Sequence, residues 1–315
     1  MAVFTSFSRE QLERYLVMFR LGDLVLYDPI HEGTENSNYF ITLTRHGVET
    51  EYVLTLFESL GFADLPYFSQ LLTGLHHHNL PVPSPITTLD GMTTTILCGK
   101  PAILFPRLPG SHIMDPDGHH CGVIGTALSK LHTTDLPEHL NRENKFNLPW
   151  FKSCRDELHS FFDATDYQLL SRVVDEYEDF LANRGAELPK GVIHGDLFRD
   201  NALFADGELS GLIDFYHSCN DFLTLDLTIA INDWCHDDNQ RFVPGLYQAL
   251  LAGYATGRTL SEDELLSLPM LLRVAAAKFW IRRSLLAQKG EKQRDPEEFK
   301  KILTGWYGES LDLLD

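Results

Sequence analysis

The sequence predicts an α+β protein with two lobes, a small antiparallel-sheet lobe over residues 1–106 and a larger, mainly helical lobe over residues 107–315. Three observations support this prediction. The chain has 315 residues, which is enough for two domains or one large bilobal domain. Its apolar residues have the spacing of strands in much of the first third and the spacing of helices afterwards. A turn-rich segment, Pro106-Arg107-Leu108-Pro109-Gly110, separates the two regions.

The first third is expected to begin with a helix, because Ser8 and Gln11 have the spacing of a capping box and apolar residues follow at helical intervals. A second helix is expected over 65–75. Apolar and polar residues alternate over 24–30, 39–43 and 52–56, which are expected to form strands, and two more short strands are expected over 93–97 and 101–105. A turn at His46-Gly47 joins the second and third strands. This pattern predicts an antiparallel sheet.

The remainder of the chain is expected to be mostly helical, with apolar residues at helical spacing from Val123, over 169–181, and from about Leu223 onward. One segment departs from this pattern. Two apolar runs flank Asp206-Gly207, and this dipeptide is a strong signal for a tight β-hairpin. A ligand site is expected in the cleft between the two lobes.

The composition excludes several classes of function. Lys and Arg total 26 against 45 Asp and Glu, giving a net charge of −19 at pH 7, which repels nucleic acid and anionic lipid. The chain has neither the start of a signal peptide nor an uncharged apolar run of about 18 residues. Its five cysteines form no C-x-x-C pair, which argues against a disulfide framework or a zinc site and favours core positions. We expect a cytoplasmic protein without nucleic-acid or membrane partners.

The predicted hairpin gathers three polar side chains. Pairing outward from its turn places Asn201 close to Leu212, so Asn201 and Asp214 lie at the same open end. Asp196 lies on the segment that leads to this end. Two carboxylates and an amide oxygen are hard ligands that suit Mg²⁺ held with the phosphates of a substrate. The arrangement predicts phosphoryl transfer, in which one carboxylate accepts a hydroxyl proton and other groups hold the metal.

The motif HGD-x-x-x-x-N followed by IDF, within residues 192–215, resembles the catalytic loop and metal-binding segment of the aminoglycoside phosphotransferase and choline kinase group. These proteins are small-molecule kinases with a protein-kinase-like fold. The lobe order, the joint and the motif position extend the resemblance over most of the chain. It implies ATP and Mg²⁺ as cofactors, Asp196 as the catalytic base, Asn201 and Asp214 as metal ligands, and His194 as a brace of the loop.

A further Asp of this kinase group precedes a helix and bonds to the backbone of the catalytic loop. Asp226 stands at the corresponding place. We therefore expect it to support the loop, and a plain carboxylate at a helix N-terminus is an equal alternative.

The nucleotide is expected to contact the sheet lobe. Segment 33–39 lies between the first two predicted strands, where a kinase has its nucleotide-covering loop, and offers Asn36, Ser37 and Asn38 as donors. An ordinary polar turn is the alternative, because the segment lacks G-x-G-x-x-G. In the third strand, Thr55 lies where the V-A-I-K pattern places a phosphate-binding lysine, and the next helix has no evident Glu partner. Mg²⁺ and backbone donors would then neutralise more of the phosphate charge.

Several strings resemble the homoserine kinase branch of this group, namely GTENSNYF, YVLTLFE, IAINDWC, GYATGRTLSEDELLSLP and AAAKFWIRR. This resemblance implies L-homoserine as the acceptor of the phosphoryl group. Such a zwitterion needs an anion for its ammonium group and a cation for its carboxylate. The candidates to contact it are Asp233, Trp234, Trp280, Arg282 and Arg283. A solvated helix face for the arginines and core positions for the tryptophans are the alternatives.

Two other functions stay open on the sequence alone. The chain could phosphorylate another small amine alcohol on the same fold, such as choline, hydroxylysine or methylthioribose, although a choline site needs several aromatic faces around one cation. It could also be a catalytically inactive kinase fold that only binds ligands, as the missing lysine suggests. The intact set of Asp196, Asn201 and Asp214 argues against an inactive protein.

Overall fold

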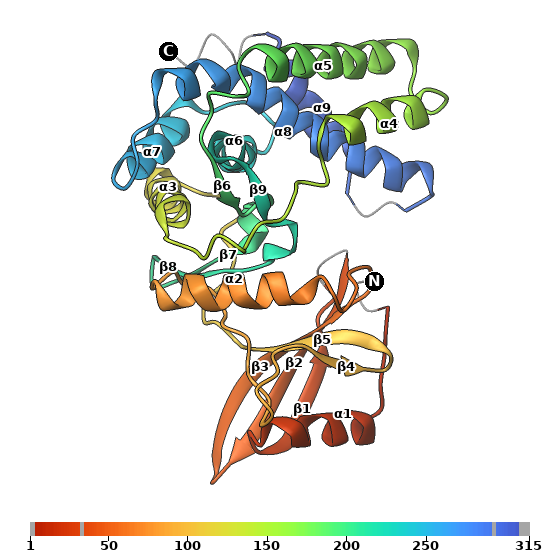
Figure 1. The fold of residues 1–315 in the computed structure, drawn as a ribbon, viewed down its shortest axis with the longest axis vertical. Helices are drawn as coiled ribbons and strands as arrows, with labels where there is room; N and C mark the ends of the chain where they lie inside the picture. The colour runs from red at the N-terminus through yellow and green to blue at the C-terminus, as the bar shows by residue number, and fades with distance from the viewer. Residues whose placement is uncertain (1–3, 32–34, 292–293, 309–315) are drawn as a thin grey trace.

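The computed structural model describes residues 4–31, 35–291 and 294–308. It has the α+β architecture that the sequence predicts, with an antiparallel sheet followed by a mainly helical region (Figure 1). The chain passes from the sheet to the helices through the turn-rich segment after Pro106. The predicted fold class is therefore confirmed.

The N-terminal part contains a five-stranded sheet in the order β1-β2-β3-β5-β4, with every neighbouring pair antiparallel. Its strands are β1 (Asp23–Pro29), β2 (Asn36–Arg45), β3 (Val48–Phe57), β4 (Thr95–Leu97) and β5 (Lys100–Pro106). The predicted turn between β2 and β3 is present. His46 and Gly47 both have positive φ values, 54° and 79°, as the tight turns of twisted hairpins require.

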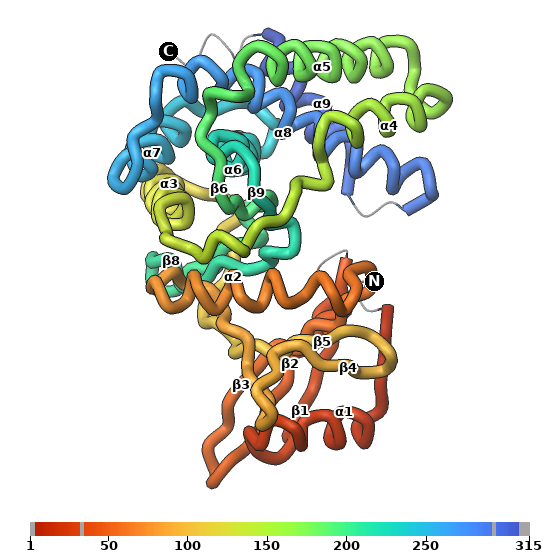
Figure 2. The backbone as a smooth tube through the Cα atoms, viewed as in Figure 1, coloured from red at the N-terminus to blue at the C-terminus, as the bar shows by residue number. Residues whose placement is uncertain are grey.

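The two faces of this sheet pack against different helices. Ile41 and Leu54 belong to a core shared with α1 (Arg9–Leu16). Ile103 belongs to a second core, which includes the buried face of α2 (Leu65–His77) and continues into the helical region. Figure 2 shows α2 running between the sheet and the helical region. The sheet is thus joined to the helical region through α2.

The C-terminal part is mainly helical, with two small sheets. Its helices are α3 (Gly118–Thr133), α4 (Leu148–Leu158), α5 (Ala164–Asn183), α6 (Leu223–Trp234), α7 (Pro244–Ala255), α8 (Glu262–Gln288) and α9 (Pro296–Gly305). The two antiparallel strand pairs are β6 (Lys190–Ile193) with β9 (Cys219–Phe222), and β7 (Ala202–Ala205) with β8 (Glu208–Leu212). Short 3₁₀ turns are η1 (Val17–Phe19), η2 (Arg199–Asn201) and η3 (Phe215–His217). Nearly all residues of α6 are buried, so this helix forms the centre of the core.

The predicted hairpin is β7–β8, and its pairing differs from the expectation by one residue. The register shifts at a bulge, where the Ser210 hydroxyl donates a hydrogen bond to the Pro109 carbonyl oxygen (2.6 Å). Asn201 consequently lies opposite Ile213, whose N–H donates to the Asn201 carbonyl oxygen (3.0 Å), and not opposite Leu212. A contact with the distant joint segment therefore accompanies the change of register.

The cysteines are free thiols, and four of the five are buried while Cys98 is exposed. The expected core position is therefore wrong for Cys98, which lies at the β4–β5 turn. Within the described ranges, no helix combines the length and apolar character needed to cross a membrane.

Candidate active site

The structure brings the predicted polar trio together at one end of the β7–β8 hairpin. The Asn201 side-chain amide donates to the Asp196 main-chain oxygen (2.7 Å) and lies 3.4 Å from its carboxylate Oδ2. Asp214 follows Ile213, the residue paired with Asn201. Its φ of 61° lies in the left-handed region, which Asp tolerates better than most residues. The chain therefore turns directly after the hairpin and keeps Asp214 at its open end.

The loop before the hairpin is held by a buried carboxylate. Asp226 on α6 accepts hydrogen bonds from the N–H groups of His194 and Gly195, at 2.8 Å each, and contacts His132 Nε2 at 3.1 Å. Gly195 has a φ of 77°, and a Cβ there would lie 2.7 Å from the His217 carbonyl oxygen. Asp226 thus supports the catalytic loop, as expected from the sequence, and is not merely a carboxylate at a helix N-terminus.

His194 connects this loop with the segment that contains Asp214. Its Nε2 lies 3.0 Å from the Ile213 carbonyl oxygen, and its Nδ1 lies 3.3 Å from the Asp196 N–H. Nδ1 must accept in this arrangement, so the ring is neutral and donates from Nε2. Burial lowers the pKa of His194, which agrees with a neutral ring.

A lysine that the sequence analysis did not identify lies behind the loop. Lys278 on α8 is 4% exposed, and its Nζ donates to the Gly195 carbonyl oxygen (2.6 Å). Nζ lies 4.7 Å and 4.5 Å from the ring centroids of Phe146 and Phe279. Burial lowers the pKa of Lys278 to about 8, although the charge of Asp196 opposes this shift. The feature of the sequence that could have identified Lys278 is its position as a single lysine in the apolar helical segment AAAKFW.

The Asp196 carboxylate is ionised at neutral pH. Burial by itself raises the pKa of Asp196, but electrostatic interactions with His217 and with the positively charged Arg282 and Lys278 outweigh burial and hold the pKa below its usual value. One guanidinium nitrogen of Arg282 lies 3.9 Å from Asp196 Oδ1. The carboxylate is therefore able to accept a proton.

Asp214 lies in the opposite electrostatic environment. Burial, followed by the charges of Asp196, Glu35 and Asp200, raises the pKa of Asp214 to about 8. Among the residues that the structure describes, no side chain donates a hydrogen bond to this carboxylate. The Asn201 amide nitrogen donates to Asp196, and the Asn201 side-chain oxygen has no hydrogen-bond donor in the described part of the chain. A carboxylate and an amide oxygen in an excess of negative charge fit a hard divalent cation such as Mg²⁺.

An ion pair between the two parts of the molecule lies beside Asp196. Glu35, immediately before β2, contacts the Arg282 guanidinium of α8. The same carboxylate oxygen lies 3.3 Å from His217 Nε2. Neither Glu35 nor His217 was a sequence candidate, because each lies far along the chain from Arg282. Their contact depends on how the sheet packs on the helices.

Four other sequence candidates have partners within the protein. Arg283 pairs with Glu298 (2.6 Å) on α9. The Asp233 carboxylate accepts a hydrogen bond from the Arg199 N–H (2.7 Å). Trp234 is fully buried, as the core alternative states, and its indole N–H donates to a main-chain oxygen of the catalytic loop. The fully buried Trp280 likewise stacks on Phe162 in the core.

Two of the residues expected to contact phosphate face each other across β2 and β3. Asn38 pairs with Thr55 in the strand register, and the Thr55 hydroxyl donates to Asn38 Oδ1 (2.7 Å). Asn36 is buried at the first position of β2. The earlier part of the predicted nucleotide-covering segment, Gly33 and Thr34, lies outside the described residues.

Ser37 is the centre of a separate polar network in the sheet. Its hydroxyl donates to the Glu58 carboxylate (2.6 Å) and accepts from the N–H groups of Phe4 and Thr5 (2.8 and 3.0 Å). Glu58 also pairs with Lys100 at 2.9 Å. The single hydroxyl hydrogen of Ser37 is therefore used inside the protein.

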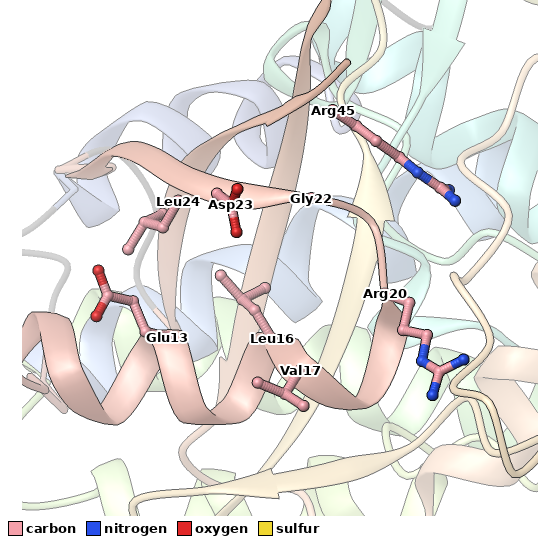
Figure 3. A pocket seen from close by; sticks show the side chains of 8 residues that line it. All are labelled: Glu13, Leu16, Val17, Arg20, Gly22, Asp23, Leu24 and Arg45. Carbon is pink, nitrogen blue, oxygen red and sulfur yellow. The ribbon is translucent and has the colours of Figure 1, made fainter. Parts of the chain in front are cut away.

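A hollow of about 540 Å³ lies away from these groups, between α1 and β1 (Figure 3). It is lined by Glu13, Leu16, Val17, Arg20, Gly22, Asp23, Leu24 and Arg45. None of the polar trio contributes to it. We therefore place the candidate active site at the Asp196 cluster and not in this hollow.

The fold and this site define a kinase-like phosphotransferase, and comparison with known proteins agrees. Residues 27–260 match the model of the phosphotransferase enzyme family. The chain is 40% identical over 307 residues to a homoserine kinase of Pseudomonas aeruginosa (strain LESB58), covering 96% of each chain. It is 37% identical over 320 residues to a homoserine kinase of Cupriavidus taiwanensis, covering 96% of this chain and 94% of that relative. The chain therefore belongs to the phosphotransferase enzyme family, within its homoserine kinase group.

A solved structure extends the comparison of the fold. The chain superimposes on the amicoumacin kinase hAmiN, in complex with AMP-PNP, Ca²⁺ and Ami, with a TM-score of 0.73. The match covers 95% of this chain and 92% of that one at 15% sequence identity. This likeness concerns the fold alone.

Proposed function

We propose that this protein transfers the γ-phosphoryl group of ATP to the hydroxyl group of L-homoserine, giving O-phospho-L-homoserine and ADP. This is the branch step toward threonine, and we place it in the cytoplasm. The observation that carries the proposal is the convergence of Asp196, Asn201 and Asp214 at one hairpin end. Homoserine kinases that match nearly the whole chain support the choice of acceptor. ATP as donor is supported by the family and by the AMP-PNP complex of the structural relative.

In this proposal Asp196 is the general base. Its carboxylate accepts the hydroxyl proton while the hydroxyl oxygen attacks the γ-phosphorus. The new oxygen–phosphorus bond forms as the bond to the ADP oxygen breaks. The buried contacts of Asp226 and Lys278 with the loop hold the carboxylate in place. A positioned base of this kind contributes about 10² to 10⁴ in rate.

Asn201 and Asp214 would hold Mg²⁺ through the free amide oxygen and the carboxylate. The bound ion would neutralise phosphate charge near the site of transfer. The side chain of His194 keeps Ile213, and with it the start of the metal-binding segment, against the catalytic loop.

The nucleotide would lie between an N-terminal lobe of residues 1–106 and a C-terminal lobe of residues 107–315. We assign the phosphate side of this site to β2 and β3, with Asn36, Ser37, Asn38 and Thr55 as the participating residues. The hydroxyl groups of Ser37 and Thr55 both donate hydrogen bonds within the protein. Ser37 and Thr55 would then act mainly by fixing the strand ends.

An ADP-release assay over a panel of small alcohols tests the proposal. The panel contains L-homoserine, choline, hydroxylysine and methylthioribose. We expect L-homoserine to turn over at about 1–100 per second, the usual range for kinases. Choline should have a kcat/KM lower by about 10³-fold or more. It has no carboxylate group, so the protein cation that binds the carboxylate of homoserine would be left unpaired. A higher kcat/KM for another member of the panel would replace homoserine as the acceptor. ATP binding without turnover of any alcohol would indicate an inactive kinase fold.

A further inference from the structure

The ion pair of Glu35 and Arg282 is placed where a small substrate must lie. Arg282 contacts Glu35 through one guanidinium nitrogen, and its other terminal nitrogen lies 3.9 Å from Asp196 Oδ1. One guanidinium group therefore separates the Glu35 carboxylate from the general base. Glu35 is 38% exposed at its side chain, so the pair is open to solvent and to a ligand.

The cation of this pair is held in position by aromatic rings. The Arg282 guanidinium carbon lies 5.2 Å and 5.8 Å from the ring centroids of Phe146 and Phe279. Lys145 Nζ lies 4.9 Å from the Phe146 ring. Contacts with aromatic faces fix a guanidinium group while leaving its N–H edge free for a carboxylate. The fork of Arg282 would therefore be preserved if Glu35 moved away.

The Glu35 carboxylate requires a positive partner. Burial alone would raise its pKa, but the hydrogen bond and charge of His217, with the charges of Arg282 and Lys145, lower the pKa overall. Leaving such a carboxylate unpaired is costly. An ammonium group would replace the lost cation, whereas a neutral group would not.

We propose that L-homoserine binds by replacing the Glu35–Arg282 contact, with its ammonium group on Glu35 and its carboxylate on Arg282. This inference rests on the proposed function. The short carbon chain of homoserine would then direct its hydroxyl group to Asp196, the neighbour of Arg282. Glu35 and Arg282 would each lose the other as a partner and gain the oppositely charged group of the substrate. Neither charge would be left unpaired.

The exchange makes specificity a property of both parts of the molecule. Glu35 immediately precedes Asn36 at the start of β2, whereas Arg282 belongs to α8. A substrate lacking either charge would leave one member of the pair unsatisfied or would have to bind beside an intact pair. Arg282 and Glu35 are therefore specificity-determining residues, each for a different end of the substrate.

A simpler role for the pair is to join the sheet to the helical region. The Arg273–Glu176 pair (3.0 Å), between α8 and α5, provides a matched control because it joins two elements away from Asp196. Loss of a purely structural pair would lower stability without changing the preference among substrates.

The experiment compares the full-length Glu35→Gln and Arg282→Gln variants with the wild type and with Arg273→Gln. Each is assayed with L-homoserine, with 4-hydroxybutanoate, which lacks the ammonium group, and with 3-amino-1-propanol, which lacks the carboxylate. The binding of L-homoserine in the presence of AMP-PNP is measured by calorimetry. Thermal unfolding shows that each variant is folded.

We expect Glu35→Gln to lose about 10²-fold in kcat/KM for L-homoserine, mainly through KM, and less than about threefold for 4-hydroxybutanoate. Arg282→Gln should lose a similar factor for L-homoserine and less than about threefold for 3-amino-1-propanol. Calorimetry should show the same weakening of homoserine binding. Arg273→Gln should retain the wild-type order of substrates.

Equal losses on all three substrates, or no loss on any, would overturn the partner exchange. If the wild type phosphorylates L-homoserine in that case, only this inference fails. If the wild type does not phosphorylate L-homoserine, the proposed function fails first. The two failures are thus distinguished by the wild-type measurement.

Discussion

The catalytic loop and the β2–β3 strand pair use their polar side chains in opposite ways. Around the loop, Asp226 and Lys278 are buried and form hydrogen bonds with main-chain groups. These bonds fix the loop that carries Asp196 without involving the Asp196 carboxylate. In the strand pair, polar side chains bond to one another, as in the network of Ser37 and Glu58. From this comparison we infer that the helical region supplies the reactive groups and that the sheet supplies a fixed surface.

The two regions also differ in positive charge. Lys145, Lys278 and Arg282 surround Asp196, and the cations at Lys278 and Arg282 come from α8. In the sheet, Thr55, which the sequence resemblance aligns with a phosphate-binding lysine, donates a hydrogen bond to Asn38. We infer that phosphate charge is neutralised chiefly from the helical side.

The largest effect is expected for Asp196→Asn. The amide keeps the shape of the carboxylate but cannot accept the proton, so kcat should fall by about 10²- to 10⁴-fold. Substrate KM values should change little. Steady-state kinetics measures both quantities. Retention of more than a tenth of the wild-type kcat would exclude Asp196 as the base.

Asp206→Asn is the matched control for this substitution. Asp206 lies at the hairpin turn with a φ of 53°, which Asn adopts readily. Its kcat should equal that of the wild type, because the turn is at the opposite end of the hairpin from Asp196.

The second largest effect is expected for Asp214→Asn. Asparagine adopts the left-handed backbone conformation readily, so the substitution removes the charge without straining the chain. Loss of outer-shell partners already costs about 10- to 100-fold in metal affinity, and loss of a direct ligand should cost at least as much. The Mg²⁺ concentration for half-maximal rate should rise accordingly. Asn201→Ala should cause a smaller rise, because it removes a neutral ligand. An unchanged Mg²⁺ requirement in both variants would contradict the metal assignment.

The third effect is a pH dependence carried by Lys278. Burial lowers the pKa of Lys278 to about 8, so the ammonium loses its charge as the pH rises through that value. If this charge supports Asp196, kcat should fall by about tenfold per pH unit above pH 8. Lys278→Arg keeps the charge and should remove the alkaline fall, whereas Lys278→Met should be slow at every pH. Identical alkaline limbs in the wild type and Lys278→Arg would contradict this role.

Much of the fold follows from short-range patterns that the structure confirms. The capping box of Ser8 and Gln11 begins α1, and His46-Gly47 and Asp206-Gly207 form the two predicted turns. Each depends on residues close together in the chain, where steric and hydrogen-bonding preferences act alone. The bulge at Ser210 could not be predicted, because it involves Pro109, about a hundred residues away.

The placement of the candidate site residues depends on distance along the chain in the same way. The convergence of Asn201 and Asp214 follows from one hairpin, whereas the contact of Glu35 with Arg282 joins distant parts of the chain. Arg282 and Arg283 are neighbours on one helix, and only the packing of α8 shows that the first faces Asp196 and the second pairs with Glu298. The residues of α8 are buried on most sides of the helix. The spacing of its apolar residues therefore does not predict which side faces Asp196.

The smallest effect on activity is expected in the sheet, for Ser37→Ala. The substitution removes a hydroxyl that accepts from two main-chain N–H groups and donates to Glu58. The free energy of unfolding should fall by about 1–3 kcal/mol, the cost of leaving buried partners unsatisfied. KM for ATP should stay within about threefold of the wild type, because the hydroxyl hydrogen is already used. Urea unfolding and initial rates provide the two measurements.

The exposed Ser59, two residues after β3, is the matched control. Ser59→Ala should change neither stability nor KM, because its side chain makes no hydrogen bond with the described residues. A tenfold rise in KM for ATP in Ser37→Ala, without loss of stability, would mean that Ser37 contacts the nucleotide directly. The sheet would then supply phosphate ligands as well as a surface, and the contrast with the catalytic loop would be one of degree.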